Sequence, residues 1–202
     1  MHSAPFGIAG VLVVLLTGCE VSTTTSTYDP SPSQKSLDIS GNVENTGEFT
    51  PMSALFGIAP AYGFSGTAID SPHQQVAITS FSDTCGNSDV EGQILYLDFF
   101  QDPTAADASV SEPASFQVWQ PSRGAEVPAG NVVVASYAVT GPEGGSLWLA
   151  ESGSVEVSDV SEDVLSATVD LDYAHGSLWG SFFALGCQDW MRSSNVPTPP
   201  AP

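Results

Sequence analysis

The chain has 202 residues, 42% of them hydrophobic, and its 3 Lys and Arg against 23 Asp and Glu give a formal charge of −20. So few cations argue against nucleic-acid binding and against electrostatic docking on anionic lipid, because both need clustered positive charge. The apolar content suffices for one folded domain, or at most two small ones.

The only long apolar run extends from Phe6 to Leu16. It is too short to cross a bilayer of about 30 Å as a helix, but it suits the core of a signal peptide. The run ends in Leu16-Thr17-Gly18-Cys19, with small residues directly before the cysteine. This stretch resembles the lipobox of bacterial lipoproteins. The resemblance implies cleavage before Cys19, a diacylglycerol on its sulfur and acylation of the freed amine.

A lipidated Cys19 would hold the protein on a membrane, because each buried CH₂ contributes about 0.8 kcal/mol. The expected location is the bacterial cell envelope, facing the periplasm or the cell exterior. One feature departs from the lipoprotein pattern, since no Lys or Arg precedes Phe6. The alternative is an ordinary secretory signal in which Cys19 has no role.

Composition divides the rest of the chain into three parts. Residues 19–51 are rich in Ser, Thr and Pro and poor in apolar side chains, which predicts a flexible tether behind a signal peptide of residues 1–18. Residues 192–202 predict a disordered Pro-rich tail. Residues 52–191 remain as the folded domain.

Period-two alternation between turn residues dominates that domain, and no helical apolar stripe is sustained. The pattern predicts an all-β fold, an antiparallel β-sandwich or small barrel of about eight or nine strands. A tight hairpin turn is expected at His175. The predicted strands are Phe64–Ile69, Val76–Phe81, Gln93–Phe100, Ser115–Trp119, Val132–Val139, Ser146–Ala150, Ser154–Val160, Val164–Tyr173 and Ser177–Leu185.

Cys85 and Cys187 each follow the end of a predicted strand. An exported domain meets an oxidising compartment, so a disulfide between them is expected. The alternative is two free thiols with a redox or metal-binding role. The closing stretch, with Gly180, Phe182, Ala184 and Cys187, resembles the C-terminal hairpin of predicted lipoproteins from Gram-negative bacteria. That group has no established activity, so the resemblance implies the fold alone.

No catalytic constellation stands out, and we predict that the domain is not an enzyme. Beyond the signal peptide the chain has two histidines, His73 in a predicted loop and His175 in a predicted turn. Neither has the local context of a base that activates a nucleophile. A glycosidase needs only two nearby carboxylates, so it stays open as a third-ranked alternative.

Calcium is the one cofactor that the acidic loops suggest. Asn87, Asp89, Glu91 and Asp98 have some of the spacing of a calcium-binding loop, although no helix flanks them. The alternative is a polar hairpin loop that enters a strand. A second acidic group, Asp159, Glu162 and Asp163, could hold a hard cation between loops.

Three tryptophans lie on the less apolar side of their predicted strands. Trp119, Trp148 and Trp179 could together form an aromatic platform for sugar rings, or they could belong to a second apolar layer. The sequence therefore predicts a membrane-anchored envelope protein with a non-enzymatic domain in a structural or interaction role. The alternative is a ligand-binding module that takes glycan on tryptophans or calcium on acidic loops; a protein or glycan partner is not identified.

Overall fold

The structure is a computed structural model that describes residues 37–59, 62–64, 67–69, 72–82, 85, 91–101, 109–122, 126–142 and 144–187. All regular elements in these ranges are strands. Among them there is no helix with the length and apolarity needed for a membrane crossing. The predicted signal peptide, Cys19 and the predicted tail lie outside the described residues.

Twelve strands follow one another along the described part of the chain. They are β1 (Asp38–Val43), β2 (Ser53–Ala59), β3 (Tyr62–Phe64), β4 (Thr67–Ile69), β5 (His73–Thr79), β6 (Gly92–Phe100), β7 (Ala114–Val118), β8 (Val132–Gly141), β9 (Gly144–Leu149), β10 (Ser152–Val160), β11 (Val164–Tyr173) and β12 (Gly176–Gly186).

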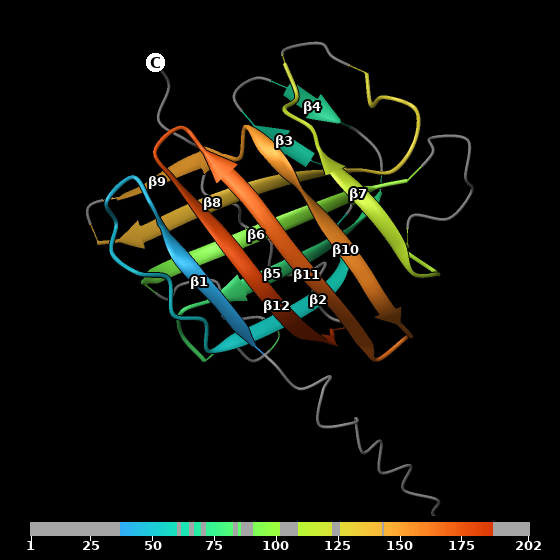
Figure 1. The fold of residues 1–202 in the computed structure, drawn as a ribbon, viewed down its shortest axis with the longest axis horizontal. Helices are drawn as coiled ribbons and strands as arrows, with labels where there is room; N and C mark the ends of the chain where they lie inside the picture. The colour runs from blue at the N-terminus through green and yellow to red at the C-terminus, as the bar shows by residue number, and fades with distance from the viewer. Residues whose placement is uncertain are drawn as a thin grey trace, which may run out of the picture.

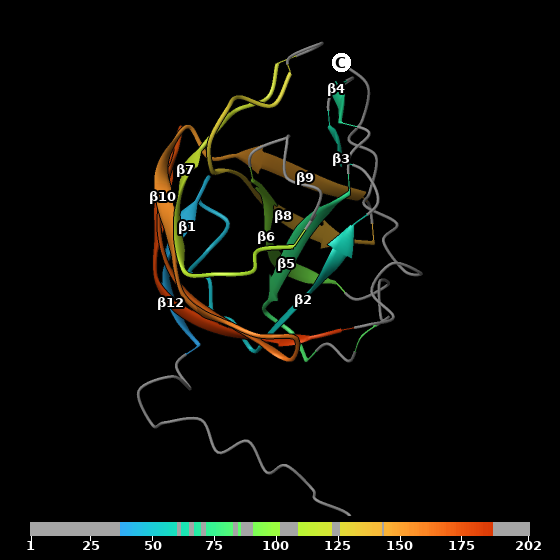
Figure 2. The ribbon, with the colours of Figure 1, turned by 90° about the vertical axis from the view of Figure 1, so that its right-hand side faces the viewer.

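Two layers of strands face each other across one core. The first sheet has the order β1-β12-β11-β10-β7, and its strands cross in front of the second sheet, β9-β8-β6-β5-β2 (Figure 1). Viewed from the side, the first sheet curls under the second at the end where β12 reaches β2 (Figure 2). The hairpin β3–β4 forms a separate two-stranded sheet.

Two short parallel bridges close these sheets into a barrel. Residues 117–118 at the end of β7 pair with residues 132–133 at the start of β8. Residues 185–186 at the end of β12 pair with residues 55–56 of β2. The closed ring contains eight strands, with β1 and β9 as additions at its edges. The prediction of an all-β small barrel is confirmed.

Inward-facing side chains of both sheets fill the barrel. The largest fully buried ones are aromatic: Phe49, Phe99, Phe116, Tyr137 and Phe182. Phe99 and Phe116 join the two sheets edge to face, with ring centroids 4.9 Å apart. The second sheet is also apolar on its outer face, and all seven residues of β5 are buried.

The folded domain begins earlier than the sequence predicts. The predicted tether of residues 19–51 is wrong from Asp38 onward, because β1 pairs with β12 along its whole length. Ile39, Val43 and Phe49 are almost completely buried and belong to the main core. Three apolar residues spaced over eleven positions are a weak sequence signal, yet each one fills the core.

Other strand predictions differ in detail. β2 was not predicted at all, and the predicted strand Phe64–Ile69 is instead the hairpin of β3 and β4. β5 begins at His73, three residues before the predicted start, because polar residues His73, Gln74 and Gln75 are buried in it. β11 has the predicted bounds, since its apolar and polar residues alternate from Leu165 to Tyr173.

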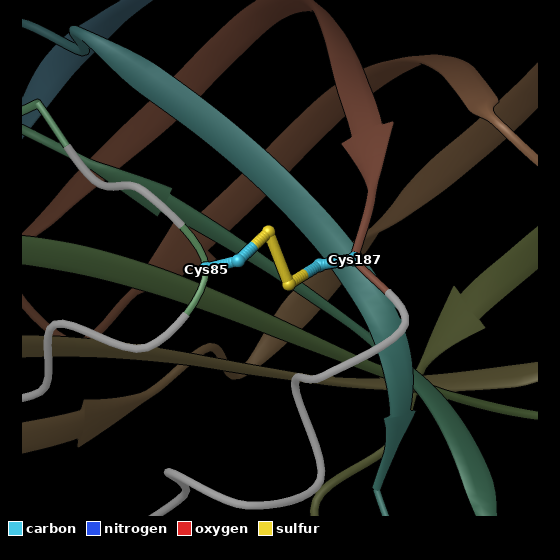
Figure 3. The surroundings of a disulfide bond; sticks show 2 residues. All are labelled: Cys85 and Cys187. Atoms are coloured by element: carbon cyan, nitrogen blue, oxygen red, sulfur yellow. A yellow bond between two sulfur atoms is a disulfide. The ribbon is translucent and has the colours of Figure 1, made fainter.

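Cys85 and Cys187 form the predicted disulfide, with Cα atoms 5.8 Å apart and a sequence separation of 102 (Figure 3). Cys187 follows β12 directly, and its backbone N–H donates to the carbonyl of Phe56 at 2.8 Å. The disulfide therefore supports the place where β12 meets β2. On the chain-entropy model a loop of this length contributes about 4–5 kcal/mol.

Glycines allow β1 to lie close against β12. Gly180 has φ +142° and Gly41 has φ +131°, a backbone region that L side chains rarely adopt. A Cβ at Gly180 would collide with the carbonyl oxygen of Asp38, and one at Gly41 with that of Ser177. The pairing that brings Ile39 into the core thus depends on residues without a side chain.

We predict that Gly180→Ala destabilises the domain by at least about 2 kcal/mol, because it adds both backbone strain and a steric conflict. Urea unfolding followed by tryptophan emission measures the change. Gly141→Ala is the matched control, since Gly141 has no positive φ and the nearest atom to its added Cβ is 3.8 Å away. Equal unfolding midpoints for the two variants would contradict this account of β1.

Candidate functional site

Trp179 is the most prominent exposed aromatic side chain in the described part of the molecule. It is 52% exposed and lies on the outer face of the first sheet. In β12 it alternates with Leu178, which is fully buried. Strand alternation therefore directs the indole outward, because the preceding Leu178 faces the core.

Short polar side chains surround the indole on this face. The cross-strand partners of Trp179 are Ser40 in β1 and Asp170 in β11. Ser177 and Ser181 precede and follow it on the same face of β12. Directly opposed residues in a sheet lie about 5 Å apart, so hydroxyl and carboxylate groups border the ring on both sides.

The indole forms one wall of an open depression of about 440 Å³. The segment that follows β1 forms another wall, held by a bridge between Asn42 and Glu48 and by a 2.9 Å hydrogen bond from Phe49 N–H to Gly41 C=O. We call this feature the Trp179 depression. Its lining residues are Ser40, Gly41, Asn42, Glu48, Gly176, Ser177 and Trp179.

The other two tryptophans do not join Trp179, so the predicted three-residue platform is wrong. Trp148 packs against the main core, with its ring centroid 6.1 Å from that of Tyr137. Trp119 packs in a different cluster, edge to face with Phe100 at 6.3 Å. Both are partly buried; the alternative of a second apolar layer describes Trp119, whereas Trp148 packs against the main core.

The sequence pattern identified only part of this site. Alternation in β12 correctly placed Trp179 beside Ser177 and Ser181. The sequence does not predict Ser40, Asn42 and Glu48 as site residues, because they lie in the predicted tether. No local signal marks them, since their relation to Trp179 comes from the pairing of β1 with β12.

A second polar group lies buried on the outer face of the second sheet. His73 Nε2 is 2.8 Å from Asp98 Oδ1, and Gln75 Nε2 donates to the same oxygen at 2.6 Å. All three residues are at most 5% exposed. His73 also stacks on Phe100, with centroids 4.7 Å apart. The prediction of a loop for His73 is wrong; its imidazole helps to satisfy a buried carboxyl group and to fix the pairing of β5 with β6.

The calcium hypothesis gains no support from the described residues. Asp98 is 1% exposed and already engaged by His73 and Gln75, while Glu91 is exposed before β6. Asn87 and Asp89 lie outside the described residues, so the four-residue site stays a prediction. Within the described ranges, no three His, Cys, Asp or Glu side chains converge to hold a metal ion.

His175 lies in the tight turn between β11 and β12, as predicted. Its side chain is exposed, and its carbonyl accepts a 2.7 Å hydrogen bond from Glu44 N–H. The backbone of His175 thus anchors the segment that forms a wall of the Trp179 depression.

Among the described residues, two core tyrosines have clearly perturbed acidity. Burial raises the pKa of Tyr173 far above its ordinary value, and nearby Tyr137 raises it further. Burial also raises the pKa of Tyr137, while the hydrogen bond with Thr46, 3.2 Å away, opposes that shift. The Tyr173 hydroxyl has no hydrogen-bond partner within the described residues.

These two tyrosines predict a loss of stability in alkali. Both folded-state pKa values exceed the unfolded value near 10, so their contribution is complete below about pH 10 and falls as the pH rises above it. Each tyrosine adds up to about 1.4 kcal/mol per pH unit to the decrease in the free energy of unfolding. Urea unfolding between pH 7 and pH 11.5 measures this slope.

Tyr173→Phe should reduce the alkaline slope and leave stability at pH 7 unchanged or higher by about 1 kcal/mol, because it removes a buried hydroxyl without a partner. Tyr137→Phe is the comparison variant. It should reduce the slope too, but cost about 1 kcal/mol at pH 7 through loss of the Thr46 hydrogen bond. An unchanged slope in both variants would show that other groups control the alkaline transition.

Comparison of the chain with protein-family models, with curated proteins and with solved structures finds no match.

Proposed function

We propose that this chain is a lipid-anchored protein of the bacterial envelope whose barrel binds a ligand rather than catalysing a reaction. Leu16-Thr17-Gly18-Cys19, placed directly after an apolar run, supports the anchor at Cys19. The site that supports binding is the Trp179 depression, and the ligand class that it fits best is a glycan with little or no negative charge. The location that follows is a membrane surface facing the periplasm or the cell exterior.

The half-exposed indole of Trp179 carries this proposal. Burial of a large apolar ring contributes roughly 2 kcal/mol, so a ligand that covers the exposed indole would gain up to that free energy. The C–H-rich face of a sugar ring can pack on the flat indole while its hydroxyl groups reach polar groups at the edge. Ser40, Asn42 and Glu48 provide such donors and acceptors on one side.

Size and polarity favour a glycan over a protein partner at this site. A stable protein interface buries about 800 Å² on each partner and centres on several apolar anchors. Here one indole lies among Ser, Asn, Asp and Glu side chains, and the depression of about 440 Å³ suits one or two sugar rings. A protein-interaction role for the barrel is the second candidate. The absence of binding to every oligosaccharide tested would favour it.

The first test is binding of defined oligosaccharides to the purified chain by titration calorimetry. We expect neutral chitohexaose to bind more tightly than oligogalacturonate, because Glu48 and Asp170 repel carboxylates. Trp179→Ala should weaken binding at least about tenfold, while Trp179→Phe should retain part of it.

Leu185→Ala is the matched control for Trp179→Ala. Leu185 is 50% exposed on the same face of the same strand, but it does not line the depression. Its substitution should leave affinity unchanged. Equal affinities of wild type and Trp179→Ala, or no binding of any oligosaccharide at millimolar concentration, would reject the glycan site.

The anchor has a separate test. Cys19→Ser should move the protein from the membrane fraction to the soluble fraction of a Gram-negative host and abolish incorporation of labelled palmitate. Cys85→Ser is the control, because it removes a cysteine but keeps the Leu16–Cys19 stretch. Membrane association that persists without Cys19 would refute lipidation at this residue.

A further inference from the structure

A second, deeper cavity lies where β2, the start of β5, the turn between β10 and β11 and the end of β12 meet. Its volume is about 690 Å³, within the range of small-molecule sites. It shares no lining residue with the Trp179 depression. We call it the β2–β12 cavity. The residues that line it are Phe56, Gly57, Ile58, Gln74, Ser109, Val110, Ser111, Val160, Ser161, Glu162, Gly186 and Cys187.

The lining of the cavity is buried in its inner part and exposed at its rim. Phe56, Gln74 and Val110 are 8%, 2% and 3% exposed and form its inner part. Ser161 and Glu162 are exposed at the rim. A ligand would therefore place an apolar body inside and meet polar, negatively charged groups at the entrance.

Among the described residues that line the cavity, Gln74 supplies the one amide side chain. Its Oε1 accepts a 2.6 Å hydrogen bond from the backbone N–H of Val110, which fixes the orientation of the carboxamide. Its Nε2 has no acceptor among the described residues. Gln74 lines the cavity, so its Nε2 can donate to a ligand oxygen there while Oε1 stays bonded to Val110.

We propose that the β2–β12 cavity binds an uncharged amphiphilic small molecule that carries a carbonyl oxygen. Its apolar body lies against Phe56, Val110 and Val160, and its carbonyl oxygen accepts a hydrogen bond from Gln74 Nε2. Glu162 at the rim and the formal charge of −20 disfavour an anionic ligand.

The test uses two uncharged fluorescent probes and the full chain. Prodan has a naphthalene body and a ketone, and 2-(dimethylamino)naphthalene has the same body without the ketone. We expect Prodan to bind with blue-shifted emission and about tenfold more tightly than its ketone-free analogue, the factor that one hydrogen bond contributes. This comparison needs no substitution, so it does not depend on whether a variant folds.

Gln74→Glu then tests the donor itself. The new side chain still accepts from Val110 N–H but presents an oxygen in place of Nε2. It should weaken Prodan binding about tenfold more than it weakens binding of the analogue. Gln117→Glu, the same change on the exposed face of β7, should affect neither probe. Val160→Trp, which fills the entrance, should abolish binding of both, and Trp179→Ala should alter neither.

Three results would overturn the proposal. The first is no Prodan binding to the wild-type chain at 100 µM. The second is equal affinity for the two probes, and the third is equal Prodan affinity for the wild type and a folded Val160→Trp variant. None of these results bears on oligosaccharide binding at Trp179, so the two proposals fail independently.

Discussion

Closure of the barrel is the constraint on which the rest of the structure depends, and two long strands provide it by changing partner along one edge. β8 pairs with β6 over nearly its whole length, while its other edge meets β7 for two residues and then β9. β12 pairs with β11 in the same way, while its other edge meets β1 and then, for two residues, β2. Each parallel bridge is too short to hold two sheets together alone. The shared core and the disulfide beside the second bridge provide the remaining stability.

β12 positions both proposed sites because of this change of partner. Its first half, paired with β1, presents Trp179 outward beside Ser40. Its end, paired with β2, brings Gly186 and Cys187 next to Phe56 and so forms one wall of the β2–β12 cavity. The glycines that allow β1 to approach therefore shape the Trp179 depression, while the disulfide secures the part of the chain that lines the cavity.

The sequence predicts the fold class well because local alternation carries it, as the bounds of β11 demonstrate. The sequence-based prediction fails where a buried strand has few apolar residues or contains buried polar ones. β1 contains only two apolar residues, Ile39 and Val43, yet both are buried, and β5 begins with three buried polar residues. Trp148 lies on the less apolar side of its strand, which predicts an exposed ring, yet it packs against the main core. The β2–β12 cavity has no sequence signature at all, since Phe56, Gln74 and Val110 come together only through tertiary packing.

The acidic residues disfavour anionic ligands in two ways, through the net charge of the chain and through carboxylates at the two proposed sites. At the level of composition, a charge of −20 argues against polyanionic partners. At the level of sites, Asp170 and Glu48 lie beside the exposed indole and Glu162 lies at the entrance of the deeper cavity. At the proposed sites, charges this close to a ligand would be screened less than distant surface charges and would disfavour anionic ligands even at physiological ionic strength. In the proposed location at an anionic membrane surface, these acidic side chains would disfavour lipid headgroups at both proposed sites.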